Sequence, residues 1–63
     1  MFQEDDHVRI KETGITGIVV DIYSMGGKQY YGVESDDRDT PGGYGTEGSY
    51  KIYDCLAEEL EKI

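Results

Sequence analysis

The sequence predicts a small all-β protein, built as a barrel or sandwich of four or five short strands. Three observations lead to this prediction: short segments in which apolar and polar residues alternate, β-branched residues concentrated in those segments, and glycine-rich turns between them. We expect residues 1–63 to form one domain with a small core, because a chain of this length buries only about 60% of its unfolded surface.

Two strands are predicted in the N-terminal half. In residues 7–11, Val8 and Ile10 are expected to face inward, with polar residues between them. A turn with two glycines ends this segment and leads into residues 18–23, where β-branched residues dominate. Three apolar side chains of this second strand share one face in the predicted alternation: Ile18, Val20 and Ile22.

A third strand is predicted over residues 28–34, after a short turn that contains two glycines. Its alternation places Tyr31 and Val33 inward and Tyr30 outward. Gly32 lies inside this segment, and a glycine at such a position indicates a bulge or a bend of the sheet.

Alternation returns in residues 49–54, where Tyr50 is expected in the core and Tyr53 on the outward face. For the C-terminus we favour one 3-10 turn at residues 56–59, followed by a closing strand at residues 60–63. The reason is that an open four-stranded sheet would leave an exposed edge.

The alternative for the C-terminus is a short helix beside a four-stranded sheet. Asp54 could serve as its N-cap. Three apolar residues are spaced like one helical face: Leu56, Leu60 and Ile63. Helices this short are marginal in isolation, so the strand remains the favoured prediction.

Residues 35–48 are predicted to form a long loop, which opens with acidic residues and contains Pro41 and four glycines. Loops of this length in small domains are often functional or disordered. The loop fails as an EF-hand, since Pro41 and Gly48 would occupy positions that need ligands. With only His7 and Cys55 as nitrogen or sulfur ligands, we predict no metal and no cofactor.

No catalytic function is predicted. The sequence holds one histidine, His7, and one cysteine, Cys55, and neither has a catalytic partner that the sequence reveals. A lone cysteine suits a reducing compartment, and the acidic N-terminus lacks the pattern of a secretory signal. We therefore expect a soluble, cytoplasmic protein that does not enter membranes.

Fourteen acidic residues against six basic ones give a formal net charge of −8. Nucleic-acid binding generally needs a basic surface, so this balance argues against it. Three roles fit the charge better: it keeps a small protein soluble, it steers the protein to a basic partner, or it imitates nucleic acid.

The order of the segments resembles a known family of domains. Residues 8–22 hold a strand, a glycine turn and a Gly-Ile-Val-Val stretch, and they look like the opening hairpin of KOW and Tudor-like SH3 barrels. Val33-Glu34 is similar to the third strand of that family, and residues 57–63 look like its 3-10 turn and last strand. The resemblance implies a five-stranded SH3-like barrel, and KOW modules commonly meet RNA or the ribosomal and transcription machinery. This sequence departs from that pattern by lacking a basic surface.

The leading functional hypothesis is a binding module for a basic protein partner. Six tyrosines are present, and tyrosine supplies large contact area with few rotors to immobilise. Tyrosine rings and carboxylates together would attract arginine or lysine. The candidate partner-binding residues are the tyrosines expected outside the core and the acids of the loop: Tyr23, Tyr30, Tyr44, Tyr53, Asp36, Asp37 and Asp39.

Two alternatives belong to other classes of function. One is a KOW-like RNA or DNA binder, which would require a basic face formed by Arg9, Lys11, Lys28 and Lys51. The other is an acidic nucleic-acid mimic that blocks a DNA-binding protein, of the kind that a phage or mobile element encodes.

Overall fold

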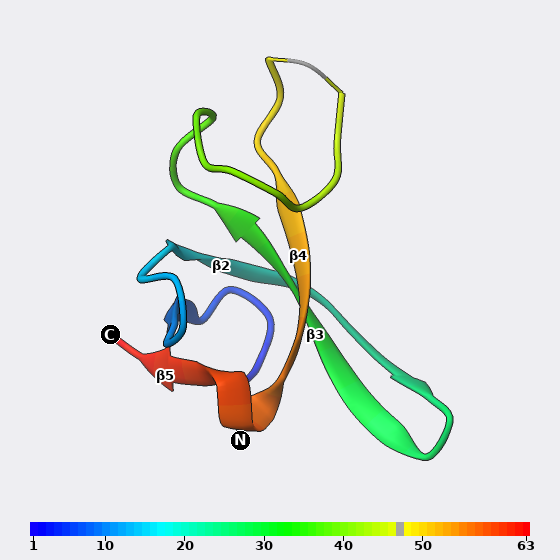
Figure 1. Cartoon of the computed structure of the whole chain (residues 1–63). Helices are drawn as coiled ribbons and strands as arrows, with labels where there is room; N and C mark the ends of the chain where they lie inside the picture. Colours follow the sequence, from blue (N-terminus) through cyan, green and yellow to red (C-terminus); the bar gives the residue numbers. More distant parts are fainter. Residues whose placement is uncertain (47) are drawn as a thin grey trace.

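A computed structural model describes residues 1–46 and 48–63; position 47, inside the predicted loop, lies outside the described residues. These residues form a five-stranded antiparallel sheet with a single 3-10 turn and no α-helix (Figure 1). The prediction of an all-β fold is confirmed. Nowhere in these two ranges is there a helix long and apolar enough to cross a membrane.

The five strands lie close to the predicted segments. They are β1 (His7–Ile10), β2 (Thr16–Met25), β3 (Lys28–Ser35), β4 (Ile52–Leu56) and β5 (Leu60–Lys62). The 3-10 turn η1 (Ala57–Glu59) directly precedes β5, so the favoured C-terminal prediction is confirmed and the helical alternative is wrong. The strand prevails because β5 pairs with β1, which supplies the hydrogen bonds of a sheet.

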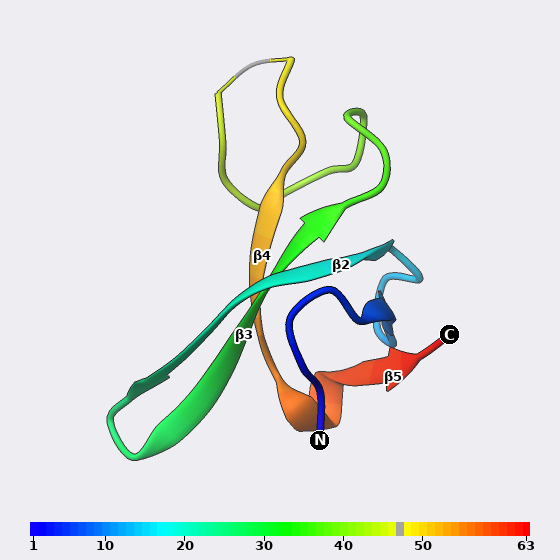
Figure 2. The ribbon, with the colours of Figure 1, turned by 180° about the vertical axis from the view of Figure 1, so that it is seen from behind.

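The strands follow the order β4–β3–β2–β1–β5 in the sheet. Buried side chains from both ends of this order form one cluster, so the sheet coils around its own core. They are Val8, Ile10, Val19, Tyr31, Val33, Cys55 and Leu60. Among the described residues, no pairing of β4 with β5 closes the sheet into a barrel. The far half of the β2–β3 hairpin projects from this body in both views (Figures 1 and 2).

A β-bulge in β2 changes the predicted alternation. Val19 lies opposite Val33 and Asp21 lies opposite Gly32, which leaves Val20 as the extra residue. Val19 is consequently fully buried and Val20 is 43% exposed. The prediction that Val20 shares one face with its apolar neighbours is wrong, because the extra residue shifts the phase. The sequence indicated a bulge or bend at Gly32 of β3, and the structure places the bulge in β2, directly beside Gly32.

The phase of β4 is also opposite to the prediction. Cys55 is buried, and Tyr53, two residues earlier, packs against the core beside it. Tyr50 lies before the strand and is 40% exposed, with the Arg38 guanidinium 4.9 Å above its ring. The predictions of Tyr50 in the core and Tyr53 outside are therefore wrong. The alternation was taken from residues 49–54, whereas β4 spans Ile52–Leu56. The buried residue that sets the inward face of β4 is Cys55, which lies outside the predicted segment.

The middle of the long loop lies along β4 and is called the strap here (residues 40–44). The Tyr53 hydroxyl donates to the Pro41 carbonyl and lies 2.9 Å from Thr40 Oγ1. Tyr44 and Ile52 exchange two backbone hydrogen bonds, of 3.0 and 2.9 Å. A side chain on Gly43 would stand 2.9 Å from the Tyr53 ring, so this close approach requires glycine. The strap is thus fixed to β4 at both ends.

Candidate functional site

The face of β2, β3 and β4 that points away from the core carries two of the candidate partner-binding tyrosines, Tyr23 and Tyr30. Its rows follow from the strand register, since residues directly opposite one another share a face. In one row Tyr23 lies opposite Tyr30. In the next row Asp21 and Asp54 lie on either side of Gly32. Gly32 contributes no side chain to this row, and it is buried between its neighbours.

Three tyrosines surround Asp54 on this face. The rings of Tyr23 and Tyr30 are stacked, with centroids 5.6 Å apart and planes inclined by 19°. Tyr44 reaches the same place from the strap, and its hydroxyl donates to an oxygen of Asp54. Tyr44 is able to do so because its backbone pairs with Ile52, two residues before Asp54 on β4. We call Asp21, Tyr23, Tyr30, Tyr44 and Asp54 the tyrosine–aspartate cluster.

The hydroxyl protons of two tyrosines are retained strongly in this cluster. Desolvation, followed by a hydrogen bond to Asp54, raises the pKa of Tyr23 to about 12. The hydrogen bond to Asp54 is the largest cause that raises the pKa of Tyr44, and desolvation and the charge of Asp21 add to it. Both hydroxyls are protonated at neutral pH, and the Tyr44 hydroxyl donates its proton to Asp54.

No basic side chain of the described residues neutralises the cluster. The ion pairs found among the described residues are His7–Asp36, Arg9–Glu61 and Lys62–Asp6. Asp21 and Asp54 are exposed and take part in none of them. The cluster therefore presents two uncompensated carboxylates beside stacked aromatic rings.

The structure brings together three of the four predicted tyrosines, while the loop acids Asp36 and Asp37 form their hydrogen bonds with other residues. Tyr23, Tyr30 and Tyr44 belong to the cluster, whereas Tyr53 faces the core and holds the strap. Sequence reasoning missed Asp21 and Asp54 as site residues. The sequence did hold a signal for Asp21: it lies two residues before Tyr23 in a predicted strand, so alternation places both side chains on the same face.

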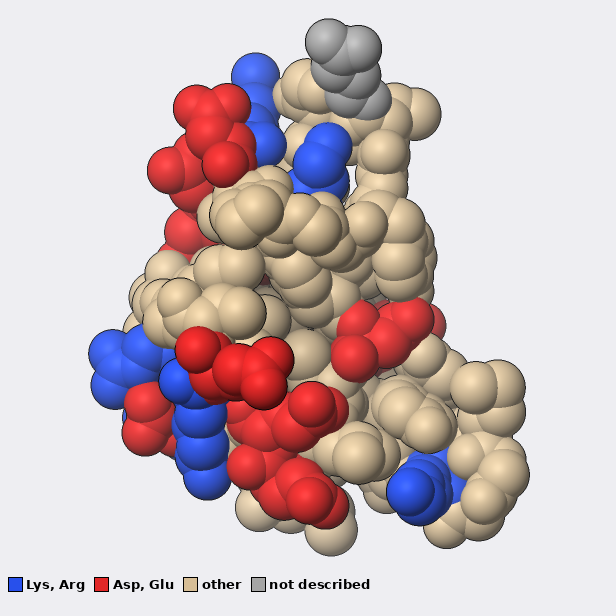
Figure 3. Space-filling model, viewed as in Figure 1, with Lys and Arg blue, Asp and Glu red and all other residues tan. Residues whose placement is uncertain are grey.

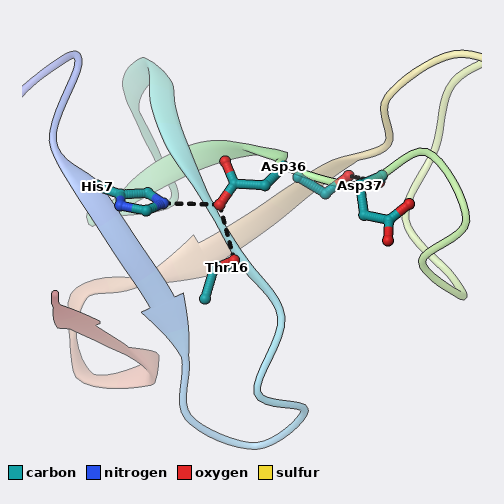
Figure 4. A network of polar contacts seen from close by, with 5 residues as sticks. His7, Thr16, Asp36 and Asp37 are labelled. Atoms are coloured by element: carbon teal, nitrogen blue, oxygen red, sulfur yellow. Dashed lines mark hydrogen bonds and ion pairs between the residues drawn. The ribbon is translucent and has the colours of Figure 1, made fainter.

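Asp36 connects the start of the loop to the first two strands (Figure 4). Its Oδ2 atom lies 2.7 Å from His7 Nε2 and accepts a hydrogen bond of 2.8 Å from Thr16 Oγ1. The hydrogen bond from His7 and the one from Thr16 lower the pKa of Asp36. Asp36 thus anchors the loop to the sheet.

Asp37 and Asp39 shape the turn that follows. The Asp37 side chain accepts a hydrogen bond of 2.9 Å from the backbone N–H of Asp39, which is an Asx-turn. The Asp37 carbonyl accepts a further bond from Ser35 Oγ, at 2.6 Å. Asp37 therefore orders the loop locally, and the Asp39 side chain is exposed.

The basic residues required by the nucleic-acid alternative are spread over the molecule. Arg9 Nε donates to Glu61 at 2.7 Å, and Lys51 Nζ lies 3.4 Å from the Thr46 carbonyl. Lys28 begins β3 at the tip of the hairpin. In the view of Figure 3 the basic side chains are dispersed, with acidic ones between several of them.

Comparison with known proteins found no match: no family model, no curated protein and no solved structure matches this chain. Function is therefore inferred from the cluster and its surroundings.

Proposed function

We propose that this chain is a non-catalytic interaction module that binds a basic segment of a protein partner through the tyrosine–aspartate cluster. The observation that carries the proposal is the convergence on one sheet face of three tyrosines and two aspartates that take part in no ion pair with the described residues. Cation–π attraction and charge complementarity would act there together on an arginine or lysine side chain.

The scaffold of this module is, in our proposal, an SH3-like barrel. The strand order β4–β3–β2–β1–β5 and the 3-10 turn directly before β5 support it. The shared core between β1, β5 and the other strands also supports it, since a coiled sheet that buries one face on itself approaches a barrel.

The acidic loop contributes to the proposed function in two ways. Through its strap it supplies Tyr44 to the cluster. Its other acids add to the net charge of −8, which would raise the encounter rate with a basic partner at low salt. In this proposal Asp36 and Asp37 act through loop structure and through the field of the whole protein, without direct contact at the cluster.

The test is a titration of the isotope-labelled full chain with a short peptide that contains both arginine and lysine, followed by two-dimensional NMR. We expect the amide signals of Tyr30, Gly32 and Asp54 to shift most. The affinity should fall as salt rises, because screening weakens attraction between exposed charges.

Two variants with equal charge separate a specific site from general attraction. Asp54→Asn removes a carboxylate of the cluster, and Glu12→Gln removes one from the exposed turn between β1 and β2. Asp54→Asn should weaken binding strongly, and Glu12→Gln should leave it nearly unchanged. Equal losses in the two variants, or an affinity indifferent to salt, would count against the proposed site.

A further inference from the structure

We infer that the far half of the β2–β3 hairpin is a contact surface for a second copy of this chain, with β2 of the two copies paired antiparallel around Tyr23. The far half of the hairpin, residues 21–32, is called the arm here. The contact uses the edge of the sheet, so it is independent of the proposed function, which uses a sheet face.

The edge of β2 that points away from β3 is unpaired along the arm. β1 pairs with β2 over Thr16–Ile18, and two backbone hydrogen bonds with Asp5 and Asp6 extend this pairing to Val19. Beyond Val19, the backbone pairing of β2 found among the described residues is with β3 alone. In both views the arm extends away from the other strands (Figures 1 and 2).

The turn at the tip of the arm decides which backbone groups point outward. Its two glycines have φ angles of 61° and 79°, as in a two-residue type I′ turn. Met25 and Lys28 flank the turn and lie opposite one another, so they form the first hydrogen-bonded pair of the hairpin. Bonded and non-bonded pairs alternate along an antiparallel ladder. The N–H and C=O groups of Ile22 and Ser24 therefore point away from β3, toward the open edge.

The features that usually protect a sheet edge are absent from this stretch. Proteins cover such edges or place charges, proline or bulges on them. The strap lies along the edge of β4, and the short strand β5 carries Glu61 and Lys62. Residues 22–25 contain neither a charge nor a proline, and the bulge of β2 precedes them. Met25 is 62% exposed. This edge is thus free to pair with a further strand.

The charge distribution favours a second copy at this edge. The net charge of −8 makes most approaches of one copy to another repulsive. The arm holds two charged residues of opposite sign, Asp21 and Lys28, so its formal charge is zero. Two copies that meet arm to arm consequently bring together the parts of their surfaces that repel least.

The open backbone groups specify the register of the contact. One symmetric antiparallel register pairs Ile22 of each copy with Ser24 of the other, so that all the outward groups of these residues are bonded. Tyr23 then lies opposite the Tyr23 of the second copy. Because Tyr23 and Tyr30 are already opposite and stacked, four tyrosines form one row across the two hairpins.

The same register brings opposite charges into one row. It places Met25 opposite the second copy's Asp21, and Met25 also lies opposite Lys28 in its own hairpin. Lys28 and the second copy's Asp21 therefore share a face, with their α-carbons about two strand spacings, roughly 10 Å, apart. The flexible stem of lysine can reach across this separation. Two-fold symmetry repeats the pair on the other side of the contact.

The first test is dilution of the isotope-labelled full chain, followed by two-dimensional NMR. Since so short an edge makes a weak contact, the series runs from about 1 mM to about 20 μM protein. We expect the amide signals of Ile22 and Ser24 to shift with concentration. A mixture of labelled and unlabelled chains should show a cross-copy contact between the α-protons of Tyr23, which face each other in a non-hydrogen-bonded pair.

Two proline variants separate this edge from the opposite edge of the hairpin. Ser24 and Gln29 lie opposite one another, and their N–H groups point out of the hairpin on its two sides. Proline is tolerated at such positions, so both variants should fold, and their amide spectra verify it. Ser24→Pro should abolish the concentration dependence, and Gln29→Pro should retain it.

A charge exchange tests the register. Asp21→Lys changes the net charge from −8 to −6, which reduces the general repulsion between copies. It also places two lysines in one row, so the contact should weaken severalfold. Asp21→Lys combined with Lys28→Asp restores opposite charges and should restore the contact.

The outcomes are separate from those of the proposed function. Signals of the native chain that do not change with concentration, or changes confined to the strap or β5, overturn this inference. A tighter contact in Asp21→Lys also overturns it, since net charge and not the row would then govern association. Binding of a basic peptide and its loss in Asp54→Asn are measured on the sheet face and stand or fall independently.

Discussion

Asp54 is the residue that joins three separate parts of the chain at the proposed site. It lies on β4, accepts a hydrogen bond from Tyr44 of the strap, and adds to the effect of desolvation in raising the pKa of Tyr23 on β2. Its replacement should therefore be visible in the titration of both tyrosines.

We expect Asp54→Asn to lower the pKa of Tyr23 and Tyr44 toward the ordinary value of 10, with desolvation keeping Tyr23 somewhat above it. A raised pKa in the folded state means that stability from this group is complete below about pH 10 and is lost as the pH rises toward 12. Tyrosine absorbance and the NMR signals of the ring carbons follow the titration. An unchanged alkaline titration in the variant would show that Asp54 does not hold these hydroxyls.

Asp36 allows a second prediction, which concerns the stability of the protein at acidic pH. Its pKa is lowered by His7 and Thr16, so its contribution to stability is present above the ordinary value of 3.8 and is lost as the pH falls below it. Urea unfolding should show a larger loss between about pH 5 and pH 2.5 in the native chain than in Asp36→Asn. The difference should stay below about 1 kcal/mol because both partners are exposed. Asp39→Asn is the control, and the same pH dependence in all three proteins would refute the role of Asp36.

The strap is the element whose position decides whether Tyr44 reaches the cluster. Tyr53 and Ile52 of β4 hold it, the first by its hydroxyl and the second by two backbone hydrogen bonds. Tyr53→Phe should lower the free energy of unfolding by about 1 kcal/mol, since one partly buried hydroxyl that donates a hydrogen bond is lost. It should also speed amide exchange at Tyr44.

Gly43→Ala is a sharper test of the same element. Gly43 has a φ of 65°, and its added methyl would meet the Tyr53 ring at 2.9 Å and the Ile52 carbonyl at 3.0 Å. We expect the pairing of Tyr44 with Ile52 to open and peptide binding to weaken severalfold. Gly48→Ala shares the positive φ, at 82°, but meets no atom within 4 Å. If the two substitutions had equal effects on binding, backbone strain alone would explain them and the packing of the strap would not.

The limits of sequence reasoning also appear at the level of elements. Alternation placed Tyr31 and Val33 inward correctly because β3 is regular through that stretch. It failed at Val20, since a bulge depends on how two strands fit together and leaves no mark in one strand alone. It failed at Tyr53 because the buried anchor of β4 is Cys55, which lay outside the predicted strand.

The candidate site was predictable in part for the same reason. Tyr23 and Tyr30 were found from strand phase, which is local. Tyr44 was found only as a loop tyrosine, and its contact with Asp54 depends on the strap, a tertiary arrangement. Asp54 was overlooked because its position beside Gly32 depends on the register between β3 and β4. That register cannot be read from the order of residues along one strand.

At the level of the whole molecule, the net charge of −8 should make folding stability and peptide binding respond to salt in opposite directions. Repulsion among the excess acids destabilises the compact state, and salt screens it. The urea midpoint should therefore rise as NaCl increases from about 20 to 300 mM, a range over which the Debye length falls severalfold. Binding of a basic peptide should weaken over the same range. A midpoint that falls with salt would mean that the attractive pairs outweigh the repulsion.

The measurement that tests the proposed site most directly is the affinity of one arginine-containing peptide for three proteins at low salt: the native chain, Asp54→Asn and Glu12→Gln. We expect the native chain and Glu12→Gln to bind alike, with the largest NMR shifts at Tyr30, Gly32 and Asp54. Asp54→Asn should bind about tenfold more weakly, the loss of one charge-assisted contact. Equal affinity for all three proteins, or shifts confined to residues outside β2, β3, β4 and the strap, would contradict the assignment of function to the tyrosine–aspartate cluster.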